Sequence, residues 1–502
     1  MGDLLLGIDI GSSSSKAVLT RLDGHVVATA TREHAMSLPR PGWAEHDAEA
    51  VWWTDLLALL HEIGRDALAR LAALCVSGAG PCLLPLDSAG AALRPAILYG
   101  IDTRAAEEVR ELTARYGERA VLATGGSPLT TQAVGPKLYW LRRHEPEVWS
   151  RTSRFAMPSS FAVLRLTGEY VLDHHSASQC NPLYDLDGNR WRKDWAEEIA
   201  PRVELPRLLW PGEIAGTVTA AAAAQTGLPA GLPVAAGTID AWADAVSAGV
   251  LGAGDTMLTY GTTMFIVGVA PGARPHPALW LTAGVTPGSR TLAAGMATSG
   301  AITDWMRELT GVRDYGQLAA EATAIPPGAD GLVVLPYFAG ERTPLFDPLA
   351  RGGILGLTLR HGRAHLYRAV LEATAFGVRH NLEEITSAGG HPRRVVAVGG
   401  GTRGGLWTQI VSDVTGLRQE LPQQTVGAAL GDCKLAGVAA RAVEIDAPWN
   451  QTAAIVEPDE RWRATYDESY AVYREFYPAT RELAHRLTAL QHGSPARARQ
   501  HG

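Results

Sequence analysis

The chain has 502 residues and a formal net charge of −7, with 46% hydrophobic and 19% charged residues. This length exceeds what one hydrophobic core usually supports, so we expect two domains, and the ordinary composition excludes disorder over most of the chain. The acidic balance argues against a nucleic-acid or membrane-surface partner, because such a partner requires a basic face.

The first elements predicted along the chain are strands joined by short polar turns. Apolar runs at 4–10, 16–20 and 25–31, separated by Gly-Ser and Asp-Gly turns, predict a β-meander. Asp47 is expected to cap a helix that runs to about residue 74. Further strands are predicted at 74–77 and 83–86, and further helices at 102–116 and 136–143.

The second half of the chain repeats the opening pattern. The stretch from Gly231 predicts a strand, a turn and a helix, and DTMLTYGTTMFIVGVA then places a Gly-Thr-Thr turn between two apolar runs. Gly261 in this turn lies 250 residues after Gly11 in the first. Another helix is predicted at 369–389. The pattern indicates either a duplicated α/β fold or two unrelated α/β domains with ordinary hairpins.

The cysteines and the N-terminus favour a cytoplasmic protein with reduced thiols. Cys75, Cys82, Cys180 and Cys433 form no CxxC pair and no metal-ligand spacing. The first residues lack the basic region of a signal peptide, and no stretch reaches 18 uninterrupted apolar residues. We therefore expect no membrane span, and a frayed tail at 493–502.

The segment from Asp9 to Lys16, DIGSSSSK, has the composition of a phosphate-binding turn. Glycine and serine in a tight turn allow backbone amides and hydroxyls to point at one anion. Asp9 could hold Mg²⁺ through water, and Lys16, one of only four lysines, could contact a phosphate. A solvated serine-rich turn remains the simpler explanation when this segment is taken alone.

Asp240 stands where a predicted strand meets a predicted helix. A carboxylate at this position could accept the proton of a substrate hydroxyl that attacks phosphorus. The alternative is a helix N-cap, and Asp244, one helical turn further, is a competing carboxylate. The Gly261-Thr262 turn could bind the same phosphates, although alone it is an ordinary hairpin turn.

The stretch from Gly399 to Gly404 contains GxGxxG between a predicted strand and a predicted helix, and Glu420 lies 21 residues beyond Gly399. This spacing fits a dinucleotide-binding fingerprint, so an NAD-dependent oxidoreductase is a real alternative. Little chain remains beyond the motif to complete the sheet that such a unit usually has. The same glycines would also allow an adenosine to lie against the backbone.

Together these motifs resemble the FGGY family of carbohydrate kinases in the actin-like ATPase superfamily, and most of all its xylulokinases. The resemblance is carried by LGIDIGSSSSKAVL, LTYGTTMFIV, VAVGGGTRGGLWTQIVSDVTG and, most specifically, the long stretch from VVLPYFAGERTP to RHNLEEI. It implies an α/β fold of two ribonuclease-H-like lobes with an interlobe cleft, at 1–242 on the sugar side and 243–492 on the ATP side.

The resemblance also implies ATP and Mg²⁺ as cofactors and a role for each matching residue. Asp9 is the magnesium-associated carboxylate and Asp240 the general base. The expected nucleotide and phosphate contacts are Ser12, Ser13, Lys16, Gly261, Thr262, Gly300, Gly400, Gly401 and Gly404. A small-molecule sugar or polyol is the expected partner, and a homodimer is plausible. A nucleotide-switched regulator on the same fold is a further alternative, but a protein that only binds has no need for both Asp9 and Asp240.

The departures from the xylulokinase pattern all lie on the sugar side. A Gln-Met-His-Gly stretch is replaced by Ala79–Cys82, so Gly80 and Pro81 stand where the family has side chains that touch the sugar. A Trp-Asn-Asp stretch becomes 99–102 with one residue inserted and Asp102 retained, and a Lys-Asp pair becomes Ser159-Ser160. We therefore expect the same reaction on an altered polyol, with D-xylulose a poor substrate, because its hydroxyls would be buried without partners.

Overall fold

The computed structural model describes residues 2–493, which divide into two compact units. The predicted boundary after residue 242 falls inside a helix of the first unit, and the predicted tail lies outside the described residues from 494 onward. Of the described residues, the first unit comprises 2–253, 269–292 and 424–451, and the second comprises 254–268, 293–423 and 452–493.

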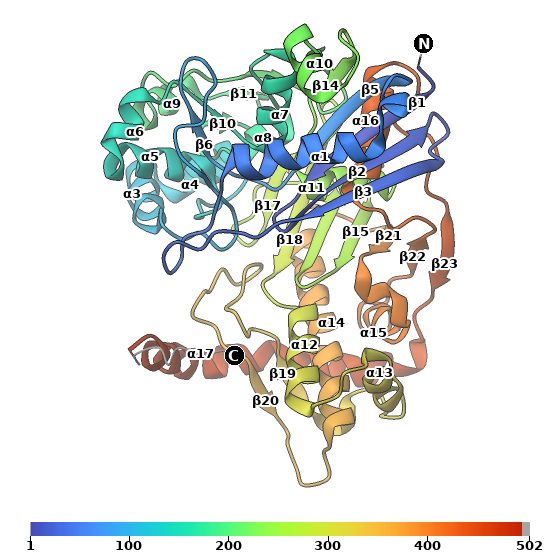
Figure 1. Ribbon diagram of the computed structural model, residues 1–502. Helices are drawn as coiled ribbons and strands as arrows, with labels where there is room; N and C mark the ends of the chain where they lie inside the picture. The colour runs from blue at the N-terminus through green and yellow to red at the C-terminus, as the bar shows by residue number, and fades with distance from the viewer. Residues whose placement is uncertain (1, 494–502) are drawn as a thin grey trace. The chain divides into compact units, whose positions relative to one another are not determined.

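The first unit is built on a six-stranded sheet in the order β13-β14-β5-β1-β2-β3 (Figure 1). β1 pairs antiparallel with β2 and parallel with β5, while β3 pairs antiparallel with β2, which confirms the predicted meander. β14 runs parallel to β5, and β13 antiparallel to β14. The strands are β1 (Leu4–Ile10), β2 (Ser14–Arg21), β3 (Val26–Glu33), β5 (Leu71–Gly78), β13 (Ile214–Thr217) and β14 (Pro233–Ala235).

The sheet of the second unit repeats this topology. β15 pairs antiparallel with β16 and parallel with β21, β22 follows parallel to β21, and β23 antiparallel to β22. Six of the seven strands of this sheet, in the order β23-β22-β21-β15-β16-β18, therefore match the order of the first unit strand for strand, which supports a duplicated fold. These strands are β15 (Asp255–Tyr260), β16 (Met264–Val269), β18 (Arg290–Met296), β21 (Arg394–Val398), β22 (Gln419–Pro422) and β23 (Thr452–Val456).

The central strand β1 is buried on both faces, as its unbroken apolar run predicts. Leu6 and Ile8 belong to a core that includes residues of α1 (Thr54–Ile63), whereas Leu5 packs on the opposite face with residues of α16 (Ala428–Ala439). A Cβ at Gly7 would lie 2.0 Å from the Ala429 carbonyl oxygen, so glycine permits α16 to approach the sheet closely. Asp9 lies on the same face of β1 as Leu5 and Gly7, and thus toward α16.

The helix predicted from Asp47 is shorter than expected. The Asp47 carboxylate accepts hydrogen bonds from the amides of Glu49 and Ala50, which confirms the cap. The helical segments are a π-helical turn η1 (Ala48–Trp53), α1 (Thr54–Ile63) and α2 (Arg65–Leu68). Gly64, at φ 89°, interrupts the helix, and β5 already begins at Leu71, so the expectation of a helix to residue 74 was wrong.

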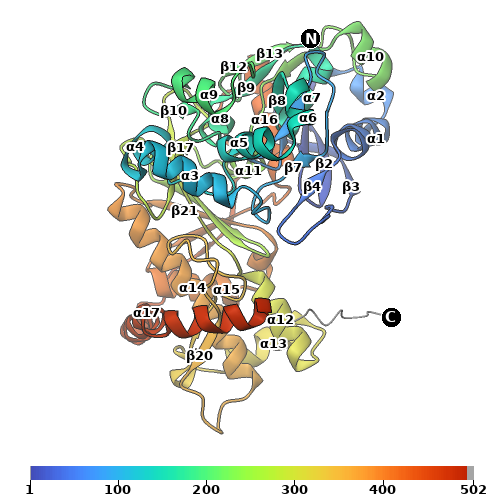
Figure 2. The same ribbon diagram turned by 90° about the vertical axis from the view of Figure 1, so that its left-hand side faces the viewer.

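The other elements surround these sheets within each unit (Figures 1 and 2). No helix among residues 2–493 is long and apolar enough to cross a membrane. The remaining elements of the first unit are β4 (Glu45–His46), β6 (Leu84–Leu86), β7 (Ala96–Ile97), α3 (Ala106–Tyr116), α4 (Glu118–Gly125), α5 (Val134–His144), α6 (Pro146–Arg151), β8 (Arg154–Ala156), α7 (Pro158–Thr167), β9 (Val171–Asp173), α8 (His174–Ser178), β10 (Tyr184–Asp185), β11 (Arg190–Trp191), α9 (Lys193–Ile199), β12 (Arg207–Leu209), α10 (Ala220–Thr226), α11 (Asp240–Ser247) and β17 (Trp280–Ala283). Those of the second are α12 (Gly300–Thr310), α13 (Tyr315–Thr323), η2 (Ala329–Gly331), β19 (Val333–Leu335), β20 (Gly353–Leu355), α14 (Arg363–Ser387), η3 (Gly400–Gly404), α15 (Leu406–Thr415), η4 (Glu460–Trp462) and α17 (Arg463–Gly493).

Candidate active site

The serine-rich turn between β1 and β2 is tight and partly open to solvent. The Gly11 amide donates to the Ser14 carbonyl at 3.0 Å, and a Cβ at Gly11 would lie 2.8 Å from that same oxygen. Ser12 is half-buried and Ser13 is exposed, so both hydroxyls are available to a ligand, whereas Ser15 is buried. The arrangement suits a turn that presents hydroxyls and amides to an anion.

Two residues that the sequence analysis did not identify, Asp55 and His34, hold this turn through hydrogen bonds. Asp55 on α1 accepts a hydrogen bond from the Ser15 hydroxyl at 2.8 Å and lies 2.7 Å from Nδ1 of His34. Nε2 of His34 lies 3.2 Å from the Gly11 carbonyl oxygen, and the His34 amide donates to the Ser13 carbonyl at 3.0 Å. The turn therefore keeps its shape before any ligand binds.

Asp9 and Lys16 stand directly opposite each other in the β1–β2 pairing. Burial raises the pKa of Asp9 to about 6, and the nearby positive charge of Lys16 opposes that rise. Lys16 Nζ donates to the Val426 carbonyl at 3.1 Å, and an ammonium group has two further protons to donate.

Asp240 is the first residue of α11, and its Oδ1 accepts a hydrogen bond from the Ala241 amide at 2.7 Å. Ile239 occupies the N-cap position, so Asp240 is not the cap. Burial raises the pKa of Asp240 well above its usual range, and the negative charge of Asp9 raises it further. A carboxylate in this environment has the higher proton affinity that a general base needs.

Asp432 on α16 and Ser77 on β5 complete this acidic region, and the sequence alone did not identify either. The Asp432 carboxylate accepts hydrogen bonds from the Ser77 hydroxyl at 2.6 Å and from the Ser77 amide at 3.2 Å. The Ser77 hydroxyl also lies 3.4 Å from Oδ1 of Asp9. Burial raises the pKa of Asp432 well above its usual range. Ser77 and Asp432 are 355 residues apart in the sequence, so no local motif could have revealed their hydrogen bond.

Asp244, the competing carboxylate, provides a stability test of this acidic region. Burial raises its pKa to about 7, the charge of Asp9 adds to the rise, and Lys16 opposes it. Such a carboxyl binds its proton more tightly in the folded state, so its stabilising contribution is complete below about pH 4 and is lost as the pH rises toward 7. Asp244→Asn is therefore expected to raise Tm at pH 8 by roughly a few degrees and to change it little at pH 4.

Thermal unfolding followed by circular dichroism at both pH values checks this expectation. Asp66→Asn on α2, where the carboxylate is exposed, is the matched control and is expected to leave Tm unchanged at both. An Asp244→Asn protein that melts at or below the wild-type temperature at pH 8 would contradict it.

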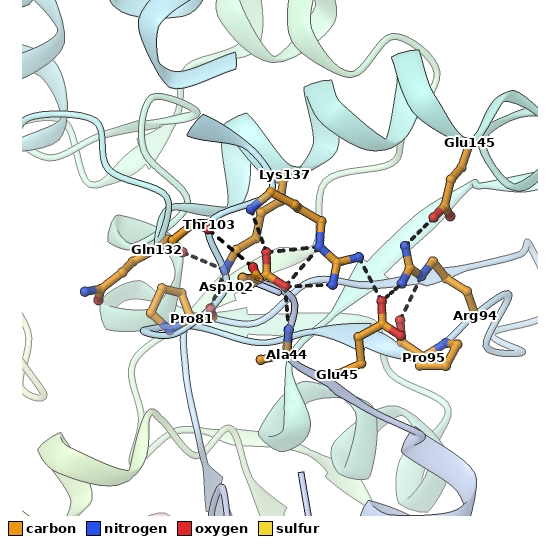
Figure 3. A network of polar contacts seen from close by, with 12 residues as sticks. Ala44, Glu45, Pro81, Arg94, Pro95, Asp102, Thr103, Gln132, Lys137 and Glu145 are labelled. Atoms are coloured by element: carbon orange, nitrogen blue, oxygen red, sulfur yellow. Dashed lines mark hydrogen bonds and ion pairs between the residues drawn. The ribbon is translucent and has the colours of Figure 1, made fainter. Parts of the chain in front are cut away.

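Asp102, an expected substrate contact, is engaged within the protein (Figure 3). Its carboxylate accepts hydrogen bonds from the Ala44 amide at 2.8 Å and from Nε and a terminal nitrogen of Arg104 at 2.7 to 3.0 Å. The Asp102 side chain is 1% exposed and that of Arg104 is 0% exposed. A direct contact of Asp102 with substrate stays a prediction. In the structure its carboxylate forms a buried ion pair with Arg104.

In the second unit, the turn after β15 is held by the start of α12. The amides of Ser299 and Ala301 donate to the Thr262 carbonyl, both at 3.1 Å, and the Gly300 amide donates to the Gly261 carbonyl at 2.9 Å. Gly261, Thr262 and Gly300, which were predicted separately as nucleotide contacts, therefore form one bonded substructure.

Gly300 tests this substructure because a side chain does not fit there. A Cβ at Gly300 would lie 2.5 Å from the Gly261 carbonyl oxygen, which is backbone and has little freedom to move. Gly300→Ala is expected to displace the turn and raise the KM for ATP by about tenfold, the effect of one lost charge-assisted hydrogen bond. Steady-state kinetics at varied ATP checks this, with Gly311→Ala at the other end of α12 as a control for general helix damage. An unchanged KM for ATP would show that the turn does not contribute to nucleotide binding.

The glycine-rich stretch forms the short helix η3, which follows β21. Gly400 and Gly404 have open space where a side chain would be, whereas a Cβ at Gly401 would lie 2.6 Å from the Trp407 ring. Gly399, at φ 96°, approaches the Tyr260 carbonyl oxygen, and so joins the glycine stretch to the end of β15. Glu420 is occupied by ion pairs with Arg394 and Arg418.

The predicted site residues thus form two groups, each inside one unit. The first unit contains Asp9, Ser12, Ser13, Lys16, Gly80, Pro81, Asp102 and Asp240, and the second Gly261, Thr262, Gly300, Gly400, Gly401 and Gly404.

Comparisons with known proteins identify the family to which this two-domain chain belongs. Sequence profiles described as the FGGY family of carbohydrate kinases match residues 4–247 with the N-terminal domain and 256–440 with the C-terminal domain. The xylulose kinase of Escherichia coli (strain K12) is 32% identical, covering 97% of this chain and 100% of that protein. A glycerol kinase of Nocardia farcinica is 31% identical, covering 86% and 89%. The crystal structure of xylulose kinase from Rhodospirillum rubrum matches with a TM-score of 0.89 at 35% identity, covering 96% and 100%.

The fold and the matches define a two-domain carbohydrate kinase of the actin-like ATPase class. The chain belongs to the FGGY family of carbohydrate kinases. It is therefore a phosphotransferase that uses ATP with Mg²⁺ to phosphorylate an alcohol group of a sugar or polyol. The alternatives of an NAD-dependent oxidoreductase and of a non-catalytic regulator find no support in these matches.

Proposed function

We propose that Asp240 is the general base of this kinase and removes the proton from a primary hydroxyl of the acceptor as its oxygen attacks the γ-phosphorus of ATP. The observation that carries this role is the position of the half-buried Asp240 near Asp9 at the start of α11, where desolvation and the charge of Asp9 raise the pKa of its carboxyl group. The Ser12–Ser13 turn and the Gly261–Thr262 turn would donate hydrogen bonds to the transferring phosphoryl group, and Lys16 would contribute positive charge.

Asp9 fits the role of the magnesium-associated carboxylate. Mg²⁺ prefers carboxylate oxygens and retains several waters, so one or two carboxylates are sufficient to hold it. Ionised Asp9 and Asp240 repel each other, since each carries a negative charge in a buried region. A cation beside Asp9 would relieve that repulsion and help to keep both groups ionised.

For the acceptor, we propose a ketose or polyol other than D-xylulose. The turn Ala79–Cys82 packs beside the base: a Cβ at Gly80 would lie 2.7 Å from the Ile239 side chain, one residue before Asp240. Ala79, Gly80 and Pro81 have no side-chain donor or acceptor, so substrate hydroxyls at this wall would lack partners. A site of this kind favours an acceptor with fewer hydroxyls, or with hydroxyls placed elsewhere.

A panel of acceptors tests this proposal. ADP release is measured with D-xylulose, D-ribulose, glycerol and sugar acids, each at varied concentration. We expect kcat/KM for D-xylulose to be at least about tenfold below that of the best acceptor, the effect of one unpaired hydroxyl. An efficiency with D-xylulose that equals or exceeds every other acceptor would overturn the substrate proposal while leaving the kinase activity in place.

We further propose a cytoplasmic location and a homodimer. Four buried cysteines without disulfides support a reducing compartment. Size-exclusion chromatography with light scattering tests the dimer, and a mass of one chain would contradict it.

A further inference from the structure

Lys137 is a fully buried lysine on α5, with 0% of the residue exposed. Its Nζ donates to the carbonyl of Pro81 at 3.1 Å and to that of Gln132 at 2.9 Å (Figure 3). Burial lowers the pKa of Lys137 to about 8, and the neighbouring thiol of Cys82 and carboxylate of Asp102 oppose this fall. Burying an ammonium group is energetically unfavourable unless it is hydrogen-bonded, so the bonds of Lys137 indicate what it holds in place.

Pro81, the acceptor of this hydrogen bond, belongs to the turn Ala79–Cys82 described above. The Ala79 amide donates to the Ile10 carbonyl at 2.8 Å, at the end of β1 where the serine-rich turn begins. At the other end, the Cys82 thiol lies 3.2 Å from the Ala79 carbonyl oxygen. The turn is thus closed on itself and bonded to the strand that carries Asp9.

The same turn contacts the segment that carries Asp240. The amide of Gly78 donates to the Thr238 carbonyl at 3.2 Å, and Gly80 packs directly against the Ile239 side chain. A shift of this turn would therefore be transmitted to Ile239 and to the start of α11. Lys137 supplies the contact that holds the turn from the α5 side.

Lys137 is itself surrounded by a buried chain of charges. Asp102 pairs with Arg104, and a terminal nitrogen of Arg104 lies 2.8 Å from Glu45, which also pairs with Arg94. The Arg104 guanidinium stacks over the Trp43 ring, with its central carbon 3.9 Å from the ring centroid. This rigid surrounding leaves the lysine little freedom to reach other partners.

We propose that Lys137 is a positioning residue for the acceptor side of the active site, which holds the turn Ala79–Cys82 in place through its hydrogen bond to the Pro81 carbonyl. The inference rests on the proposed function in one respect, that the acceptor lies against this turn. The inference goes further than the proposed function because Lys137 acts on the backbone of the turn, through the Pro81 carbonyl, and does not itself touch the substrate.

Lys137→Met removes the hydrogen bond and keeps most of the side-chain volume. The matched control is Lys434→Met in the same unit, because Lys434 is also buried, has its pKa lowered to about 8 by burial, and donates to a backbone carbonyl, that of Ala447, at 2.7 Å. Lys137→Met loses two buried ammonium–carbonyl bonds, to Pro81 and to Gln132, and Lys434→Met loses one. Both variants remove a buried ammonium group, so an effect seen only in Lys137→Met reports the place of the lost bonds.

The first readout is the order of the turn, measured without enzyme activity. Cys82 is 0% exposed, and the rate at which native protein is alkylated there by iodoacetamide, mapped by peptide mass spectrometry, reports local opening. Lys137→Met is expected to speed alkylation of Cys82 by about tenfold, the effect of one lost charge-assisted hydrogen bond, with Cys75 and Cys433 unchanged as internal references. Lys434→Met is expected to leave the Cys82 rate unchanged.

The second readout is kinetic. Lys137→Met is expected to raise the KM for the best acceptor by about tenfold and to leave the KM for ATP unchanged, whereas Lys434→Met changes neither. Faster alkylation at Cys82 without a change in acceptor KM would show that the acceptor does not lie against the turn, which overturns the proposed function of this wall but not the anchoring role. Unchanged alkylation at Cys82 would overturn the anchoring role itself.

If Lys137→Met does not fold, Lys137→Gln retains a neutral donor, and Gly80→Ala perturbs the turn from the opposite side, against Ile239. Gly80→Ala is expected to give the same increase in acceptor KM with ATP KM unchanged. A wild-type acceptor KM in Gly80→Ala would show that the acceptor does not lie against the turn. Alkylation of Cys82 at the wild-type rate in Lys137→Gln, whose amide is uncharged and reaches less far than the ammonium group, would overturn the anchoring role.

Discussion

Asp240→Asn is expected to lower kcat by at least about 100-fold, the lower end of the contribution of a general base, while the protein still folds and binds ATP. The amide has nearly the shape of the carboxylate, but it cannot accept the proton of the attacking hydroxyl. The change also removes a buried negative charge next to Asp9, so we do not expect it to destabilise the fold. Single-turnover phosphoryl transfer measures the loss, and calorimetric titration with ATP measures the retained binding.

Asp66→Asn on α2 is the control for this prediction, because Asp66 is exposed and belongs to the same unit. It is expected to keep wild-type kcat. Turnover within a few-fold of wild type in the Asp240→Asn protein would refute the assignment of the base.

The activity of the wild-type enzyme should also depend on pH in a way that follows from the pKa of Asp240. The base works only when it is ionised, and burial, together with the charge of Asp9, raises its pKa well above 3.8. The acid side of the kcat/KM profile should therefore lie above the range of an ordinary aspartate, with activity rising as the pH increases. In Asp244→Asn we expect this limb to move toward lower pH, since the charge of Asp244 also raises the pKa of Asp240.

The second large effect is expected at the buried ion pair of Asp102 and Arg104. Asp102→Ala should lower the free energy of unfolding by about 3–5 kcal/mol, the usual cost of removing one partner from a buried pair. The Arg104 guanidinium is 0% exposed and lies close to the Trp43 and Trp140 rings, and it would lose the carboxylate that accepts hydrogen bonds from its Nε and one terminal nitrogen. Chemical denaturation gives the loss directly.

Two further variants make this prediction specific. Asp194→Ala removes the exposed pair of Asp194 with Arg192 and should cost less than about 1 kcal/mol. Asp102→Ala combined with Arg104→Met should cost less than the sum of the two single changes, because the double variant leaves no buried charge unpaired. An Asp102→Ala protein as stable as Asp194→Ala would show that the carboxylate is not needed to neutralise Arg104.

Much of the fold follows from local patterns in the sequence. The run LLLGIDI is apolar on both faces and became the central strand β1, and Asp47 caps a helix as its position indicates. The repeated hairpin with Gly11 and Gly261 in its turns left open whether the two halves are related, and the matching strand orders of the two sheets support a duplication. Boundaries were less accurate: the helix expected from Asp102 begins at Ala106, because the Asp102 carboxylate binds the Arg104 side chain and the Ala44 amide.

The sequence by itself indicated the reaction class through its resemblance to the FGGY family, which the phosphate turns, the stretch around Asp240 and the glycine stretch carry together, whereas each motif alone left a simpler explanation open. Only the tertiary structure revealed the hydrogen bond between Ser77 and Asp432 and the contacts of His34 and Asp55 that hold the serine-rich turn. It also revealed the hydrogen bond from Lys137 to the Pro81 carbonyl. The reason is that burial and hydrogen bonding between distant segments depend on how the chain packs, and these set both the proton affinity of the carboxyl groups and the rigidity of the acceptor wall. Asp102 shows the difference most clearly: its motif suggested a substrate contact, whereas packing gave its carboxylate a buried arginine as partner.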